Sequence, residues 1–126
     1  MTRRYATCTF AVALGVLSFV AVAAKEPDKV DVAIEHGLEY LLAVQKESGA
    51  YPGQHGDTVA IPALAAMACL ATGHVPGDAK YGRLIERSLD YVLSNRDETG
   101  YFGKIGNGKM YAHSIATLLL TEVSGM

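Results

Sequence analysis

Hydrophobic residues recur at helical spacing along residues 30–126, and the pattern divides into four segments. The first predicted helix covers residues 30–45 and the third covers residues 81–95. Between and after them lie two more apolar segments, residues 59–72 and residues 110–123. No segment alternates apolar and polar residues at period two, which would indicate a strand. The sequence therefore predicts an all-α fold built from two antiparallel helical hairpins.

The first and third predicted helices are amphipathic, whereas the second is apolar on almost every side. The apolar stripe of the first helix consists of Val30, Ile34, Leu38, Leu41 and Leu42. The stripe of the third consists of Leu84, Ile85, Leu89 and Val92. A helix with one apolar stripe covers a core, and a helix without a polar face lies inside it. We therefore expect the alanine-rich second helix to be buried, with Pro62 tolerated because it falls in the first turn.

The two hairpins resemble each other in sequence. Residues 34–65 align without gaps with residues 85–116, at an offset of 51 (85 − 34). The residues of the first copy that meet an identical residue are Ile34, Glu35, Leu38, Tyr40, Leu42, Glu47, Gly49 and Ala65. Two amphipathic hairpins can match by chance, but here the loop glycine matches as well, and Tyr51 meets Phe102. The period favours a repeat architecture, with residues 30–75 as repeat one and residues 81–126 as repeat two.

The amino-terminal segment has the features of an export signal. Arg3 and Arg4 precede an uncharged apolar run over residues 6–22, and Val22-Ala23-Ala24 offers small residues for cleavage. This predicts a signal peptide at residues 1–24 and a short charged linker at residues 25–29. The alternative is an uncleaved anchor, because the run is close to the ~17 residues that a membrane span needs. Cleavage would leave a periplasmic or extracellular protein without a membrane span.

Charge and cysteine content narrow the classes of function. The chain has 126 residues, enough for one small domain, and a formal net charge of −2. Basic residues are not clustered, which argues against nucleic acid as a partner. Cys8 lies in the predicted signal, so Cys69 would be the one thiol left and no internal disulfide would form. In an alanine-rich helix such a thiol is typical of a small buried apolar group.

The loop before the second predicted helix holds the first candidates for a binding site. His55 and Asp57 are a ligand pair by residue type. Cys69 would lie roughly 18 Å from Asp57 along the following helix, too far to share one ion. Asp57 or Thr58 also stands where a helix N-cap is expected. We therefore expect loop and cap roles here, and no metal, no cofactor and no catalytic residue is assigned.

Tyr111 and His113 stand near the start of the fourth predicted helix. They either contact a ligand or pack against the preceding loop. The candidate ligand contacts of the chain are therefore Tyr111, His113, His55 and Asp57.

Several of these residues carry a resemblance to a known family. Gly37-x-x-Tyr40, Gln45, Gly49 and Tyr51 resemble a degenerate form of the glutamine–tryptophan repeat of squalene and terpenoid cyclases. The second copy keeps Tyr91, Gly100 and Phe102 but has Arg96 in place of the glutamine. Residues 56–73 and 110–126 resemble secreted bacterial prenyltransferase and squalene-oxidase repeat proteins. The resemblance covers residues 30–126.

The resemblance implies an α/α toroid, in which outer helices alternate with inner helices around a cavity. Residues 30–45 and 81–95 would be outer helices, and residues 59–72 and 110–123 inner ones. Gln45 would hydrogen-bond backbone groups at a neighbouring helix end, with Tyr51 packed over the contact. The structural motif of the two copies would then consist of Gln45, Gly49, Tyr51, Gly100 and Phe102.

Two hairpins cannot close a ring, so apolar surface of the inner helices would stay exposed at a cost of ~25 cal/mol per Å². We therefore expect an amino-terminal fragment that continues into further repeats, or a chain that associates with copies of itself or with a partner covering the inner helices. The function we expect is an exported, non-catalytic binding or structural module. The alternative is a fragment of a terpenoid cyclase or prenyltransferase-like enzyme with its catalytic residues beyond residue 126. The acidic cluster of the cyclases is reduced here to Asp57, which favours the non-catalytic interpretation and leaves the enzyme question open.

Overall fold

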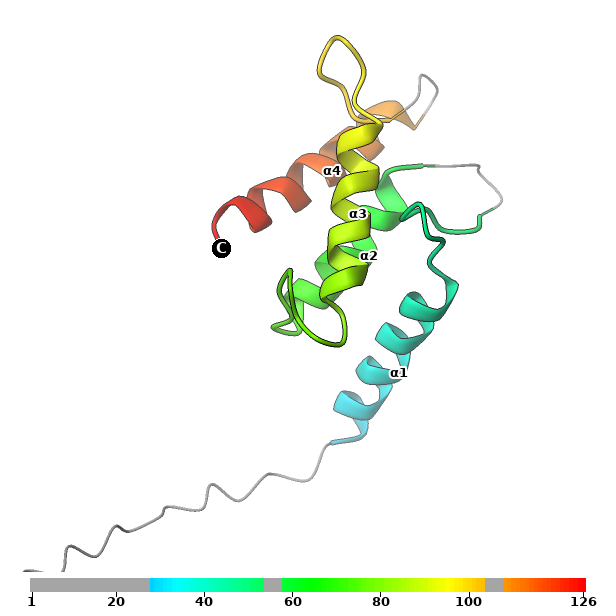
Figure 1. Cartoon of the computed structure of the whole chain (residues 1–126), viewed down its shortest axis with the longest axis vertical. Coiled ribbons are helices and arrows are strands. Elements are labelled where there is room, and N and C mark those ends of the chain that lie inside the picture. The colour runs from blue at the N-terminus through cyan, green and yellow to red at the C-terminus, as the bar shows by residue number, and fades with distance from the viewer. Residues whose placement is uncertain (1–27, 54–57, 104–107) are drawn as a thin grey trace, which may run out of the picture.

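The computed structural model describes residues 28–53, 58–103 and 108–126. Within these residues the chain forms helices α1 (Lys29–Val44), α2 (Ala60–Ala71), α3 (Gly82–Ser94) and α4 (Lys109–Ser124), and no strand (Figure 1). The all-α prediction is confirmed, and each helix begins and ends within one residue of its predicted bounds. The predicted signal peptide at residues 1–24 lies outside the described residues. Among the helices described, none is both long and apolar enough to cross a bilayer.

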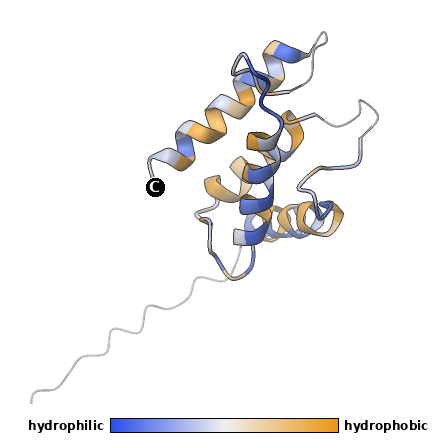
Figure 2. Cartoon of the chain, turned by 45° about the horizontal axis from the view of Figure 1, so that its top comes forward, coloured by the Kyte–Doolittle hydropathy of each residue, from blue (hydrophilic) through white to orange (hydrophobic). Residues whose placement is uncertain are grey.

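Helix α2 is the centre of the fold. It packs against α3 and against α4, whereas α1 meets it more sparsely and extends away from the other helices (Figure 1). Its buried residues are small: Ala60, Pro62, Ala63, Ala65, Ala66 and Cys69. Helix α3, which packs against α2, carries both hydrophobic and hydrophilic residues, as Figure 2 shows. Small side chains let neighbouring helices approach closely, which is why α2 can be shared by two of them.

The core is completed by larger side chains from the two neighbours of α2. From α3 it receives Leu84, Ile85 and Val92, each fully buried. From α4 it receives Ala112, Ala116 and Leu119, of which Leu119 is the one large side chain. The opposite face of α4 is exposed.

Helix α1 begins with a reciprocal cap. Asp28 Oδ1 accepts a hydrogen bond from Val30 N at 3.0 Å, and Asp31 Oδ2 accepts one from Asp28 N at 3.2 Å. Helix α2 lacks such a cap at Val59, although Thr58 Oγ1 accepts from Ala60 N at 3.3 Å. Thr58 was one of the two predicted caps, and Asp57, the other, lies outside the described residues.

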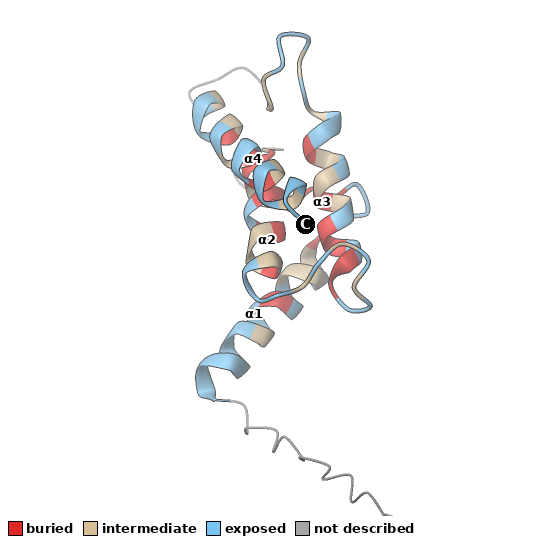
Figure 3. Ribbon diagram, turned by 90° about the vertical axis from the view of Figure 1, so that its left-hand side faces the viewer, coloured by how far each residue is buried: buried red, intermediate tan, exposed pale blue. Residues whose placement is uncertain are grey.

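The predicted burial of α1 is wrong in its first half. Leu38 is buried, but Val30 is 60% exposed and Ile34 is 43% exposed. Most of α1 is accordingly coloured as exposed in Figure 3. The reason is length, because the amino-terminal half of α1 extends past the apolar faces of its neighbours and meets the turn before α3 through the Glu35 carboxylate.

Candidate functional site

The first loop, residues 45–51, is fastened to helix α3 by a buried glutamine. Gln45 follows α1, and its side-chain Nε2 donates to the carbonyl oxygen of Leu84 at 3.1 Å and to Ser88 Oγ at 3.0 Å. Ser88 is itself fully buried. One side chain therefore joins the end of the first helix to the middle of the third.

Gly49 brings the backbone of the first loop onto the same helix. Its φ of +86° lies in the left-handed region that favours glycine. A Cβ atom at this position would stand 2.1 Å from the Arg87 carbonyl oxygen and 2.9 Å from Tyr91 Cβ. The loop is closed by hydrogen bonds from Lys46 N to the Ala50 carbonyl and from Gly49 N to the Lys46 carbonyl, both at 2.9 Å. The contact thus requires glycine for its backbone angle and for its lack of a side chain.

Tyr51, two residues after Gly49, belongs to the hydrophobic core and is 5% exposed. Burial raises the pKa of its phenol, and the neighbouring Cys69 adds to the shift. Within the described residues, neither the Tyr51 hydroxyl nor Gln45 Oε1 has a hydrogen-bond partner. The inward side of the first loop is therefore buried at Gln45, Gly49, Ala50 and Tyr51, while residues 46–48 are exposed, as suits a structural contact.

The second loop, residues 96–102, has the same backbone hydrogen bonds as the first loop, but its glycine contacts no described helix. Asp97 N donates to the Tyr101 carbonyl at 2.7 Å and Gly100 N to the Asp97 carbonyl at 3.0 Å. These are the bonds of the first loop, 51 positions later (97 − 46). Gly100 has a φ of +90°, but a Cβ there would meet nothing within 4 Å. Arg96, at the position of the glutamine, is exposed.

The carboxylate of Asp97 holds the second loop together. Its Oδ1 accepts hydrogen bonds from the backbone of Thr99 and of Tyr101, each at 2.9 Å, and its Oδ2 pairs with Lys109 Nζ at 3.0 Å. The hydrogen bonding of Thr99, and after it that of Lys109, keeps the pKa of Asp97 well below its usual range. All of this carboxylate's partners belong to the loop and the start of α4, so it is engaged in structure.

His113 faces this loop from helix α4. Its Nδ1 accepts a hydrogen bond from Phe102 N at 3.2 Å, and the two rings stack with centroids 5.7 Å apart. The Tyr101 ring lies at 4.6 Å. Of the two alternatives for His113, the geometry is that of packing against the preceding loop. Tyr111 is 62% exposed, and His55 and Asp57 lie outside the described residues.

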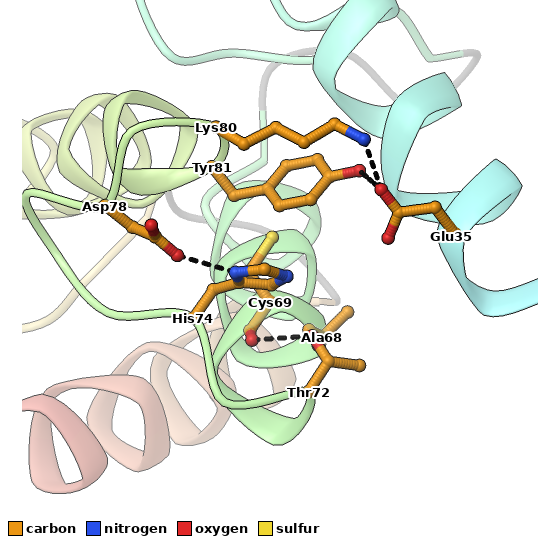
Figure 4. Close-up of polar contacts among 8 residues, drawn as sticks. All are labelled: Glu35, Ala68, Cys69, Thr72, His74, Asp78, Lys80 and Tyr81. Atoms are coloured by element: carbon orange, nitrogen blue, oxygen red, sulfur yellow. Dashed lines mark hydrogen bonds and ion pairs between the residues drawn. The ribbon is translucent and has the colours of Figure 1, made fainter. Parts of the chain in front are cut away.

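A polar cluster that the sequence analysis did not single out ties α1 to the turn before α3 (Figure 4). The Tyr81 hydroxyl donates to Glu35 Oε1 at 2.9 Å, and Lys80 pairs with the same carboxylate and, at 3.0 Å, with Glu39. The hydrogen bond from Lys80, and then that from Tyr81, lowers the pKa of Glu35. Nothing in the sequence pairs positions about 45 residues apart, so these partners were not predictable.

The same view places His74 beside Cys69 (Figure 4). His74 Nδ1 lies 2.6 Å from Asp78 Oδ2, and a cysteine near such a pair invites comparison with a nucleophilic site. A nucleophilic cysteine needs an accessible thiolate. Cys69 is instead fully buried, and burial raises the pKa of its thiol to about 11. The contact between His74 and Asp78 therefore stabilises the turn between α2 and α3, and the Cys69 thiol serves as a packing group in the core.

Cys69 is expected to resist modification in the folded chain. At pH 8 a thiol of pKa 11 is ionised on the order of 100-fold less than an ordinary one of pKa ≈ 8.5. With Cys8 replaced by serine, labelling of the folded chain by a maleimide should therefore be at least that much slower than labelling in denaturant. Equal rates in the two conditions would contradict the buried placement of this residue.

Comparison with protein-family models, curated proteins and solved structures finds no match for this chain. In the part of the chain that the structure describes, no three His, Cys, Asp or Glu side chains are grouped as metal ligands would be. What the structure brings together is Gln45 and Gly49 on helix α3, with Tyr51 in the core beyond them, and Phe102 and His113 at the second loop.

Proposed function

We propose that the chain is an exported helical-repeat module of the α/α-toroid type, similar to the repeats of prenyltransferases and squalene cyclases, with a structural or binding role. The observation that carries this proposal is the docking of the first loop on α3 through Gln45 and Gly49. The glutamine supplies donors, the glycine allows close approach, and the aromatic Tyr51 anchors the end of the loop in the core. Each residue of the motif thus has a bracing role that involves no reaction.

The second loop supports the repeat. Two backbone hydrogen bonds and a glycine of positive φ recur 51 positions later, in step with the sequence period. Two unrelated loops between helices have no reason to share these details. In a repeat protein each unit stacks on its neighbours, and the outer units keep a face without a neighbour.

The polar groups of the described residues favour a role without catalysis. Asp97 and Glu35 are held by hydrogen bonds and ion pairs, His113 accepts from a backbone amide, and Cys69 is a buried thiol. A group that serves catalysis has orienting partners too, but it must also reach a substrate in a pocket. A catalytic role of a larger toroid would have to come from residues outside those described.

The repeat is tested by inserting one period. A second copy of residues 45–95, 51 residues long, placed directly after residue 95 supplies another α2, another α3 and another Gln45 loop in phase. Because stacked repeats stabilise each other, the lengthened chain should unfold in one transition at a higher denaturant concentration than the original. The measurement is helical circular dichroism against guanidinium.

The matched control inserts residues 45–90, which is out of phase by five residues. It should lower the midpoint or split the transition. If the in-phase insertion does the same, the repeat interpretation fails. A separate incubation with a polyprenyl diphosphate and with a polyene hydrocarbon, read by mass spectrometry, should give no product, and turnover by the chain would favour the enzyme alternative.

A further inference from the structure

Among the described residues, the first loop is docked on helix α3. The first loop places Gln45 on Leu84 and Ser88, and it places Gly49 on the backbone of Arg87. The helix face that receives this loop is therefore formed by Leu84, Arg87, Ser88 and Tyr91.

The second loop has the same two backbone hydrogen bonds as the first, but its glycine is not docked on any described helix. Gly49 is buried, but Gly100 is exposed with open space at its Cβ position. The second loop therefore contacts α4 through Asp97, Tyr101 and Phe102, but at Gly100 it presents a surface that no helix covers among the described residues.

The helix face equivalent to the one on α3 lies on α1, and no described loop is docked on it. Moving the receiving residues of α3 back by 51 positions gives Ala33, His36, Gly37 and Tyr40. All four are exposed, and Tyr40 is 66% exposed. At 3.6 residues per turn they share one side of the helix, opposite the side that buries Leu38. The face is thus continuous and turned away from the rest of the chain.

The two contacts differ at several positions, and the exchange of the glutamine for a larger side chain is matched by smaller residues on the helix face. Arg96, which stands in place of Gln45, is a longer donor, and the α1 face offers Ala33 and Gly37 where α3 has Leu84 and Ser88. A Cβ at Gly37 would meet nothing within 4 Å, so there is room for the larger side chain. A helix carbonyl such as that of Ala33 keeps a lone pair that can accept from a guanidinium.

We propose that the second loop of one copy of this chain docks on the α1 face of a second copy, and that the copies associate head to tail. The proposal depends on the repeat equivalence of the proposed function. A second copy is the occupant because each chain carries both halves of the contact, each exposed in the described residues. Since the two surfaces differ, the association is heterologous and continues to further copies until a ring closes.

Two single variants separate the two surfaces. Gly100→Ala places a Cβ where the loop must approach a helix backbone, and Gly37→Arg places a long charged side chain on the receiving face. Both positions have open space around them in the single chain, but the φ of +90° at Gly100 makes alanine there cost some stability. Helical circular dichroism of each variant checks that the fold is retained. Ala79→Arg, an exposed position with the same change in charge as Gly37→Arg, is the matched control.

The measurement is sedimentation velocity of the purified full chain from roughly 10 μM to 1 mM, the range of a weak association. The unchanged chain and Ala79→Arg should grow in mass with concentration, and each of the two variants should associate at least about tenfold more weakly. An equimolar mixture of Gly100→Ala and Gly37→Arg should form 1:1 complexes and nothing larger, because it keeps one intact loop and one intact face.

A chain that stays monomeric throughout this range overturns the proposal, and so does association that neither variant weakens. The proposed function is tested separately from this association, because the in-phase insertion measures how repeats stack within one chain. If that insertion stabilises the fold while the chain stays monomeric, the repeat stands and the docking between copies fails. If the insertion destabilises the fold, the equivalence behind both proposals fails.

Discussion

Replacing Gly49 by alanine is expected to lower the free energy of unfolding by about 2–5 kcal/mol, through two separate causes. A left-handed backbone costs a residue with a Cβ about 1–2 kcal/mol, and Gly49 has a φ of +86°. The new Cβ would also stand 2.1 Å from the Arg87 carbonyl oxygen, and forcing extra atoms into a packed contact costs about 1–3 kcal/mol. The neighbouring atoms are helix backbone, which cannot yield as a flexible side chain does.

Gly100→Ala is the matched control, since Gly100 has a φ of +90° but open space at its Cβ position. It should lose the conformational part alone, about 1–2 kcal/mol. Guanidinium unfolding followed by helical circular dichroism, on dilute samples, gives both values. Equal losses for the two alanine variants would show that the first loop does not lie on α3 as the structure has it.

Leu119→Ala is expected to release helix α4 from the core. Leu119 is fully buried, and the other buried residues of α4 are Ala112 and Ala116, which contribute little apolar area. Truncating a buried leucine costs about 2–5 kcal/mol, from lost burial and from the cavity left behind. Ile115 and Val123 pack against the core while only partly buried, so loss of the helical signal of α4 before that of α2 and α3 is the expected sign.

The adjacent Leu118→Ala makes the same chemical change on the other face of α4, where the leucine is 46% exposed. Its effect should stay within about 1 kcal/mol. Thermal unfolding of the two variants, with fluorine or methyl NMR probes on α4, distinguishes local release from global loss. A Leu118 variant as unstable as the Leu119 variant would mean that α4 is packed the other way round.

The helices were predictable because their signals are local. Apolar spacing set the type of each helix, and glycine at position 49 marked a helix end, so the bounds came within one residue. The prediction for Val30 and Ile34 was wrong because periodicity identifies which side of a helix is apolar and carries no information on how far its neighbours extend. The exposed half of α1 is a property of the packing, and it appears only when α2 and α3 are placed.

The site divides in the same way. Gln45, Gly49 and Tyr51 stood out by their spacing, but the sequence did not show that Leu84, Ser88 and the Arg87 backbone receive them. Glu35, Lys80 and Tyr81 had no local signal at all, because their contacts join positions about 45 residues apart. Long-range pairs of this kind depend on the angle between helices, which a single sequence does not record.

The scant burial of α1 gives the molecule an uneven resistance to local opening. Leu38 is the one buried side chain of the helix, and Leu41, Leu42 and Val44 pack against the core while only partly buried. Its polar attachments are Gln45 at its end and the exposed carboxylates that meet Lys80 and Tyr81. Opening free energies follow buried contacts, so α1 forms a separate unit of low stability while α2, α3 and α4 open together. Its backbone amides would exchange with solvent hydrogen earliest, and any occupant of its outer face would slow that exchange by fixing a helix that is otherwise free to fray.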